Sequence, residues 1–345
     1  MRGISRIAID EAPGETLAVA YDGEGRPVRM FIERWDGVAA ISRLGDVVEG
    51  RLRKSSLLDG GCFFELVSGE PVFVRGTPDL TEGAEAKLVI MAEQRRGKLA
   101  RAKLTEAELR AESPLDRWLN SASKGMEVPV ERGFGLNDEA YDLALSPKVG
   151  LARGGLIEIS RTSALIAIDV DSAGRLGKGS DGARAHAINR EAVAEAARQL
   201  SLRNLGGLCV IDCVAPLNKE SGAKLKQTFL ETFRAISDRQ MDALAPSRFG
   251  LLETKLAWGE APIEDWIFDE TGTPTGETEL LSLFREVRRE ADADRSGFYS
   301  LVLSPKARAA YIGRKQQCED LLQSHFSGRI FVSGETSERS KVTRQ

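Results

Sequence analysis

The chain is poor in the residues that build zinc sites. Its 345 residues include four cysteines and two histidines. The cysteines, Cys62, Cys209, Cys213 and Cys318, form no Cys-x-x-Cys pair, so a cysteine-based zinc site is not expected. Cys62, Cys209 and Cys213 stand in apolar, strand-like segments, where buried thiols are common.

Long apolar runs are also missing. No segment approaches the roughly 20 residues that a membrane span needs, and residues 1–10 lack the apolar core of a signal peptide. We therefore expect a cytoplasmic protein without a membrane segment. The hydrophobic content of 42% and the charged content of 29% are ordinary for globular proteins. This length is sufficient for more than one domain.

An excess of positive charge is missing too. The sequence has 48 Lys and Arg against 52 Asp and Glu, a net charge of −4. This balance counts against a nucleic-acid partner, but it does not exclude one, because binding depends on local basic patches. Aromatic residues make up only 6% of the chain, so few side chains are free to stack on bases.

The first third of the chain alternates between short apolar runs and turns. Residues 17–21 and 28–32 read as a hairpin around an Asp-Gly-Glu-Gly-Arg-Pro turn. Several short strands with glycine-rich turns follow, which predicts a small closed barrel. These strands are expected at 46–52, 61–66, 72–74 and 86–91, with a basic turn at 95–98 and a last strand or helix start near 100–103.

The remainder divides into a connector, an α/β segment and a small final unit. Residues 106–150 read as a connector with short helices near 114–118 and 137–144. The charged tail after Gly334 is expected to fray. In the α/β segment, strands are expected at 155–160, 163–169 and 208–212, and helices at 185–203 and 223–241. In the final unit, we expect a helix at 279–291, a strand at 299–303, a helix after Pro305 and a strand at 329–332.

Three aspartates stand at the ends of predicted strands. Asp169 and Asp212 each end an apolar strand and begin a glycine-containing turn. The carboxyl ends of strands are where α/β sheets assemble sites, and two neighbouring carboxylates suit magnesium. Asp171 would face the same side, as a third ligand or as an orienter of the attacking water. On spacing alone, turn formation or helix capping is the simpler interpretation.

Aromatic and basic residues share the predicted barrel. Phe63 and Phe73 lie on strands, with Arg75, Lys87 and Lys98 near them in sequence. Such a face can stack bases and hold phosphates, although packing in the core would use the same phenylalanines. Phe63 and its neighbour Phe64 cannot both face inward on a strand.

Two further residues are weaker candidates. Arg248, in Ser-Arg-Phe-Gly-Leu-Leu-Glu, could neutralise a phosphate or form a structural salt bridge. His186 lies on a predicted helix and is assigned to the surface or to helix packing rather than to catalysis.

Together, four segments resemble the ribonuclease E/G family in order and spacing. The resemblance implies that Asp169 and Asp212 bind Mg²⁺, with Mn²⁺ a possible substitute, and that Phe63, Phe73 and Lys98 contact RNA. The segments are Ala167-Ile-Asp-Val-Asp-Ser172, Ala197-Arg-Gln-Leu-Ser-Leu-Arg-Asn-Leu-Gly-Gly207, Val210-Ile-Asp212 and Ser247-Arg-Phe-Gly-Leu-Leu-Glu253.

The resemblance also implies a multidomain α+β and α/β fold. Residues 1–40 and 106–153 would form an RNase-H-like remnant and connector, and 41–105 an OB-type RNA-binding barrel. Residues 154–258 would form a DNase-I-like α/β catalytic domain. A linker over 259–277 would lead to a small C-terminal α/β domain over 278–335.

Three departures from the family pattern matter. Asp171 stands where the family usually has asparagine. The segment between barrel and catalytic domain is too short for the domain that senses the 5′-monophosphate of RNA. The family's zinc-link, a Cys-x-x-Cys followed by Ser-Gly-Thr-Gly, matches 267–273, but Ile267 and Glu270 replace the cysteines. Neither zinc nor zinc-bridged dimerisation is expected.

The sequence therefore predicts a Mg²⁺-dependent endoribonuclease that hydrolyses single-stranded RNA to 5′-phosphate and 3′-hydroxyl ends. It would act in RNA processing or decay, rRNA included, and would be insensitive to the phosphorylation state of the 5′ end. A homodimer through the catalytic domain is compatible with the sequence. The main alternative is a catalytically weak or inactive RNA-binding protein that handles rRNA, and a second is an enzyme acting on DNA or a small phosphodiester.

Overall fold

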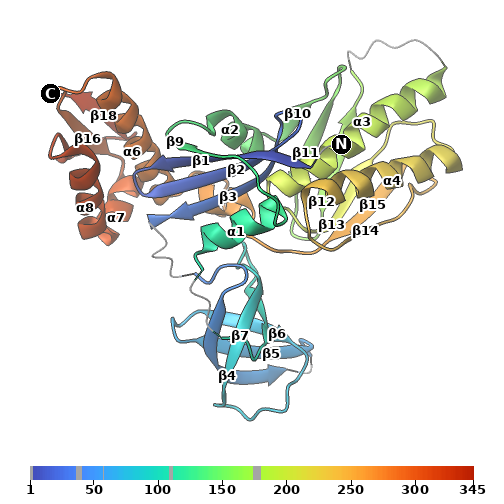
Figure 1. Cartoon of the computed structure of the whole chain (residues 1–345), viewed down its shortest axis with the longest axis horizontal. Coiled ribbons are helices and arrows are strands. Elements are labelled where there is room, and N and C mark those ends of the chain that lie inside the picture. Colours follow the sequence, from blue (N-terminus) through green and yellow to red (C-terminus); the bar gives the residue numbers. More distant parts are fainter. Residues whose placement is uncertain (1–2, 36–40, 57, 109–111, 174–179) are drawn as a thin grey trace.

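The computed structural model describes residues 3–35, 41–56, 58–108, 112–173 and 180–345. Within these ranges the chain is a mixed α/β protein with three open sheets and a closed five-stranded barrel, which confirms the predicted mixture of α/β units with a small barrel. Figure 1 shows the central sheet between two units: the six-stranded sheet with helices α3 and α4 lies at one end of it and the C-terminal unit at the other, while the barrel projects away.

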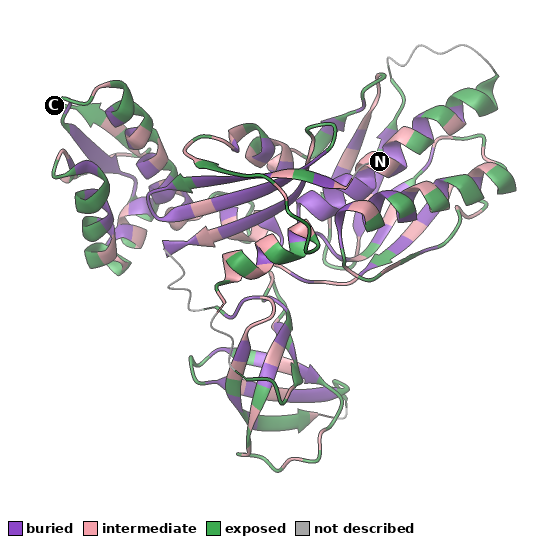
Figure 2. Ribbon diagram, viewed as in Figure 1, coloured by how far each residue is buried: buried purple, intermediate pink, exposed green. Residues whose placement is uncertain are grey.

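A four-stranded sheet forms the centre of the molecule, in the order β3-β2-β1-β9. Helix α1 packs on one face, and α2 and α5 pack on the other. Because both faces are covered, β1, β2 and β3 are mostly buried (Figure 2). The elements are β1 (Ile4–Ala12), β2 (Glu15–Asp22), β3 (Pro27–Arg34), α1 (Pro114–Ser123), β9 (Val130–Gly133), α2 (Asp138–Leu145) and α5 (Ile263–Ile267).

The barrel is inserted between β3 and α1 and has the strand order β4-β5-β6-β8-β7, closed by pairing of β4 with β7. Apolar residues at alternate positions, such as Leu52, Phe64 and Leu88, fill its interior. The strands are β4 (Val47–Ser56), β5 (Gly61–Leu66), β6 (Pro71–Arg75), β7 (Glu85–Ala92) and β8 (Ala100–Leu104).

One buried carboxylate fastens the barrel to the body of the protein. Glu93 follows β7 and is 3% exposed. It accepts hydrogen bonds from the backbone N–H of Leu44 at 3.0 Å and of Ala261 at 2.8 Å, and Arg43 lies 3.1 Å away. Burial raises the pKa of Glu93, and the Arg43 guanidinium opposes this rise. The carboxylate therefore joins three distant segments of the chain.

The six-stranded sheet has the order β10-β11-β12-β13-β15-β14. Helices α3 and α4 bury their apolar residues, among them Ala192 and Phe229, against one face of it. The outward sides of these helices are exposed (Figure 2). The elements are β10 (Lys148–Gly150), β11 (Leu156–Arg161), β12 (Ile166–Asp171), α3 (Asp181–Leu202), β13 (Gly207–Asp212), α4 (Lys219–Ile236), β14 (Met241–Ala243) and β15 (Leu251–Leu256).

The C-terminal unit packs helices on a small sheet of order β17-β16-β18. A long-range ion pair connects it to the central sheet, because Arg285 on α6 donates to the fully buried Asp10 of β1 at 2.9 Å. The elements are α6 (Gly276–Ala293), β16 (Tyr299–Leu303), α7 (Pro305–Gly313), α8 (Lys315–Phe326), β17 (Ile330–Thr336) and β18 (Lys341–Arg344).

Two predictions about element boundaries were wrong. The helix expected to reach Met241 ends at Ile236, and Met241 instead pairs with Leu256 as part of β14. The tail expected to fray contains β18, which pairs with β16 along 299–302. No helix in the described ranges combines the length and apolarity needed to cross a membrane.

Candidate active site and nucleic-acid interface

The two aspartates predicted as metal ligands stand side by side. Asp169 on β12 and Asp212 on β13 are register partners in a pair of parallel strands. Neighbouring strands lie about 4.8 Å apart, and residues paired in register point to the same face. Both side chains are exposed, so their carboxylates share one small region of the surface.

Alternation along the strands directs both aspartates to the uncovered face of the sheet. Ile168 and Val170 flank Asp169 and point into the core, and Ile211 does the same before Asp212. Helices α3 and α4 cover that apolar face. We call the opposite face, which carries Asp169 and Asp212, the open face.

The immediate neighbours of the pair limit which metal it fits. Glu158 is the register partner of Asp169 on β11, but it forms an ion pair of 3.3 Å with Lys148. In the part of the chain that the structure describes, no group of three or more His, Cys, Asp or Glu could hold a metal ion. Two carboxylates fit Mg²⁺, which keeps several waters, better than structural zinc, which protein atoms surround completely.

Asp171 lies on the open face, two residues beyond Asp169. Its carboxylate accepts a hydrogen bond of 2.7 Å from the backbone N–H of Ala173, which shapes the turn that follows β12. An asparagine could accept the same bond through its amide oxygen. The turn can therefore form with aspartate, as in this chain, or with the asparagine that is usual in the family. The role of Asp171 at the metal stays a prediction.

Arg248 and Phe249 form an exposed turn beside the aspartate pair. The Arg248 guanidinium lies 4.8 Å from the centre of the Phe249 ring, which is 71% exposed. The turn is held next to Asp212, because the N–H of Cys213 donates to Gly250 at 3.2 Å. Phe249 was not predicted from the sequence, because its exposure depends on the turn between β14 and β15.

Two other polar residues, Cys213 and His186, lie near this edge. Cys213 directly follows Asp212, but burial, together with the negative charge of the Asp212 carboxylate, raises the pKa of its thiol to about 12. A protonated thiol is neither a nucleophile nor a metal ligand. His186 is half-buried on α3, and its assignment to the surface or to helix packing stays a prediction.

The outer surface of the barrel carries the predicted aromatic pair. Phe63 and Phe73 are register partners on β5 and β6, with ring centres 5.4 Å apart. Both are half-buried, whereas Phe64 points into the barrel core and is 1% exposed. Gly61 makes room for this pair, since a Cβ there would lie 2.5 Å from the Phe73 ring.

Basic residues extend the aromatic pair on both sides. Lys54 is the register partner of Phe63, and Arg101 is the register partner of Phe73. We call Lys54, Phe63, Phe73 and Arg101 the barrel row. Lys54 and Arg101 were missed because their alignment depends on strand pairing, including an irregularity between residues 52 and 54, that the sequence does not reveal.

Lys98, the third predicted RNA contact, is not part of the barrel row. It is exposed in the turn between β7 and β8, and the same turn attaches to the body of the protein. The N–H of Arg96 donates to Asp265 at 2.9 Å, and its guanidinium donates to the carbonyl of Phe268. Lys98 therefore lies in the turn that joins the barrel to the segment at 265–268.

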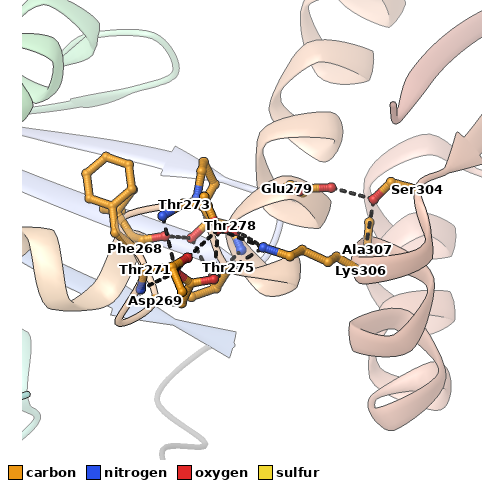
Figure 3. A network of polar contacts seen from close by, with 12 residues as sticks. Phe268, Asp269, Thr271, Thr273, Thr275, Thr278, Glu279, Ser304, Lys306 and Ala307 are labelled. Atoms are coloured by element: carbon orange, nitrogen blue, oxygen red, sulfur yellow. Dashed lines mark hydrogen bonds and ion pairs between the residues drawn. The ribbon is translucent and has the colours of Figure 1, made fainter. Parts of the chain in front are cut away.

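The turn that matches the family's zinc-link is held by a carboxylate (Figure 3). Asp269 accepts hydrogen bonds from the hydroxyls of Thr271 and Thr273 and from their N–H groups. Lys306, at the start of α7, reaches the same carboxylate at 3.2 Å. These hydroxyls, with the N–H of Thr273 and the Lys306 ammonium, hold the pKa of Asp269 well below its usual value. Ile267 is buried.

The geometry defines a class: an α/β protein with a carboxylate pair on an open sheet face and an aromatic, basic row on a separate barrel. The comparisons identify the family. Residues 84–255 match the model of the ribonuclease E/G family, and the chain belongs to this family.

Individual relatives match smaller segments. Ribonuclease E of Haemophilus influenzae is 36% identical over 137 residues, which are 37% of this chain and 13% of the relative. Ribonuclease E of Escherichia coli is 37% identical over 128 residues, 37% of this chain and 12% of the relative. Ribonuclease G of Escherichia coli is 28% identical over 179 residues, which are 50% of this chain and 36% of the relative. The matched part thus spans well under two thirds of these relatives.

Proposed function

We propose that the chain is a Mg²⁺-dependent endoribonuclease that hydrolyses single-stranded RNA. The observation that carries this proposal is the direct register of Asp169 and Asp212 on the open face. The family and the names of its relatives supply the reaction class. In this proposal the barrel is OB-type, the six-stranded sheet is a DNase-I-like catalytic unit, and the central sheet is an RNase-H-like remnant.

The residues on the open face would divide the work of hydrolysis. Asp169 and Asp212 would hold Mg²⁺, which supplies an activated water and neutralises charge on the phosphoryl oxygens. Asp171 orients the attacking water, and Arg248 pairs with a phosphate. Attack of the water oxygen forms a new P–O bond and breaks the bond to the 3′ oxygen. The products carry a 5′-phosphate and a 3′-hydroxyl.

The barrel would hold the substrate strand. Phe63 and Phe73 are half-buried and offer part of their ring surface for bases to stack on. Lys54, Arg101 and Lys98 lie where they can neutralise phosphates. Because this attraction is ionic, RNA affinity falls as salt rises. The barrel row places two aromatic and two basic side chains on one surface, although the whole chain has a net negative charge.

The decisive experiment measures cleavage of a fluorescent single-stranded RNA with Mg²⁺ and with Mn²⁺. Asp169→Asn and Asp212→Asn should each slow cleavage by at least about a hundredfold, because each removes a metal ligand. Asp242→Asn, at another exposed aspartate, is the matched control and should cleave like wild type. Wild-type protein that is as inert as the two variants contradicts the nuclease proposal.

The second candidate function is RNA binding without efficient cleavage. The barrel row favours it, because this surface is built independently of the aspartate pair. A wild type that shifts RNA in a gel but does not cut it would establish this function. Preference for DNA of the same sequence would instead support the third candidate, since only RNA offers the 2′-hydroxyl.

A further inference from the structure

A tight hairpin turn leads into β15 and carries two exposed side chains. The N–H of Gly250 donates to the carbonyl of Ser247 at 2.9 Å, and the N–H of Ser247 donates to the carbonyl of Leu251 at 2.9 Å. Gly250 has a φ of +88°, in the left-handed region that favours glycine. The turn therefore has a fixed shape, with the exposed Arg248 and Phe249 at its two central positions.

This turn lies at the edge of the sheet where the strand of Asp212 ends. β13 and β15 are antiparallel, and Leu251, the first residue of β15, is the register partner of Asp212 at the end of β13. The N–H of Cys213, the residue after Asp212, donates to the carbonyl of Gly250 at 3.2 Å. Phe249 directly precedes Gly250, so standard backbone dimensions put its Cα within about 15 Å of the Cα of Asp212. A single RNA strand can therefore contact both residues.

The two side chains of the turn contact each other and leave most of their surface to solvent. The Arg248 guanidinium lies over the Phe249 ring, 4.8 Å from its centre, and the Phe249 residue is 71% exposed. Arg248 forms no ion pair and no side-chain hydrogen bond with any described residue. Isolated exposed apolar residues are ordinary on protein surfaces. Phe249 differs from these because an unpaired arginine and the aspartate pair stand beside it.

An exposed ring beside an unpaired cation fits one class of ligand, a nucleotide of a single strand. Bases of every kind stack on aromatic rings, and a guanidinium pairs with a phosphate through two parallel hydrogen bonds. The Phe63 and Phe73 rings of the barrel row are half-buried and contact each other, whereas Phe249 offers most of its ring. Asp169 and Asp212 supply only carboxylates, which repel phosphates until a cation binds. An attractive contact beside them would therefore help to hold the strand.

We propose that Phe249 positions the RNA for cleavage by stacking on one base close to the scissile phosphate. Arg248 pairs with the adjoining phosphate, in the role that the proposed function gives it. The stack fixes where the strand crosses the end of β13 and so brings one phosphodiester to the aspartate pair. Because stacking does not read hydrogen bonds, this contact requires a base at that position but not a particular base. This inference rests on the proposed function, because it assumes RNA at the aspartate pair.

The test combines Phe249→Leu with RNAs that lack one base. A fluorescent single-stranded RNA and a set of copies, each with an abasic ribose at one position, are compared by kcat/KM. Phe249→Leu should slow cleavage of the intact RNA about tenfold. At one position near the cut, removal of the base should slow the wild type about tenfold and leave Phe249→Leu unchanged, because both changes remove the same stack. Phe249→Trp should cleave like wild type, and so should the matched control Phe298→Leu, at a phenylalanine of the C-terminal unit that is 52% exposed.

The outcomes separate a stack on RNA from a structural role and from failure of the nuclease proposal. Wild-type cleavage of the intact RNA by Phe249→Leu overturns the inference, and so does equal slowing of wild type and Phe249→Leu by every abasic RNA. If the wild type binds RNA without cutting it, the nuclease proposal fails. Dissociation constants for the same RNAs, measured by anisotropy in EDTA, then decide whether Phe249 and one base are coupled, and absence of coupling overturns the stack. Absence of RNA binding by the wild type overturns both.

Discussion

The buried Asp10 has partners, whereas Asp169 and Asp212 have none among the residues that the structure describes. Asp10 is fully buried, accepts from the N–H of Gly135 at 3.1 Å and pairs with Arg285. Asp169 and Asp212 have no hydrogen bond or ion pair with any described residue, although they stand side by side. Two adjacent carboxylates without partners repel each other, so a bound cation would relieve this repulsion.

At the same scale, the structure separates two roles for Asp171. Asp171→Asn keeps an acceptor for the N–H of Ala173, so cleavage of the fluorescent RNA should stay within about threefold of wild type. Asp171→Ala removes the acceptor and should slow cleavage by about tenfold. Cleavage of the fluorescent single-stranded RNA, the assay used for Asp169→Asn, measures the rates of both Asp171 variants. Slowing by Asp171→Asn as large as that by Asp169→Asn would instead mean that Asp171 binds the metal.

Single residues were predictable where one strand decides their environment. The alternation around Asp169 and the contrast between Phe63 and Phe64 follow from the period of two in a strand. Lys54 and Arg101 were not predictable, because two strands must be aligned to place them beside the phenylalanines. The same limit hid Phe249, whose exposure depends on a turn between two strands.

Among the elements, most of those with strong apolar patterns were predicted, although the interior strand β1 was not, and two polar strands at sheet edges were missed. The strands of the barrel and the helix α3 lie close to their expected positions. β9 was missed because it is a polar edge strand with exposed residues, held by parallel pairing with β1. β18 was missed for the same reason, since it is charged and becomes a strand only by pairing with β16.

The turn at 268–275 allows a prediction about acid stability. Because the folded pKa of Asp269 is lowered, its contribution to stability is present above its unfolded pKa, near 3.8, and is lost as the pH falls through the folded value. Asp269→Asn should therefore melt a few degrees lower than wild type at pH 7. This difference should shrink in acid, below about pH 4.

The control for this prediction is an aspartate in an ordinary surface ion pair. Asp292 pairs with Arg288 on α6 at 2.8 Å, and such exposed pairs contribute little. Asp292→Asn should leave the melting temperature unchanged at pH 7. Equal melting of wild type and Asp269→Asn across the pH range would show that the turn does not depend on its carboxylate.

On the scale of the whole molecule, the barrel contacts the body of the protein through Glu93 and through the turn that contains Arg96. Glu93 accepts from the N–H of Ala261, and Arg96 contacts Asp265 and Phe268. A substrate strand could therefore extend from one unit to the other. None of the proposed RNA contacts on this path is assigned to recognising the end of the RNA.

This arrangement predicts indifference to the 5′ end of the substrate. Two RNAs of the same sequence, one with a 5′-monophosphate and one with a 5′-triphosphate, should be cleaved at equal rates, because we assign no residue to binding the terminal phosphate. Initial rates with the wild type under identical conditions provide the measurement. Much slower cleavage of the triphosphate RNA would require a sensor that the sequence interpretation does not include.

The ion pair between Asp10 and Arg285 has a consequence for folding during synthesis. The two residues are 275 positions apart, so the ribosome makes β1 long before it makes its partner on α6. The central sheet also waits for β9, which is made after the whole barrel. The barrel, whose strands are contiguous in sequence, can fold first. Until α6 emerges, Asp10 lacks its cation, and the nascent central sheet is the part most in need of protection by chaperones.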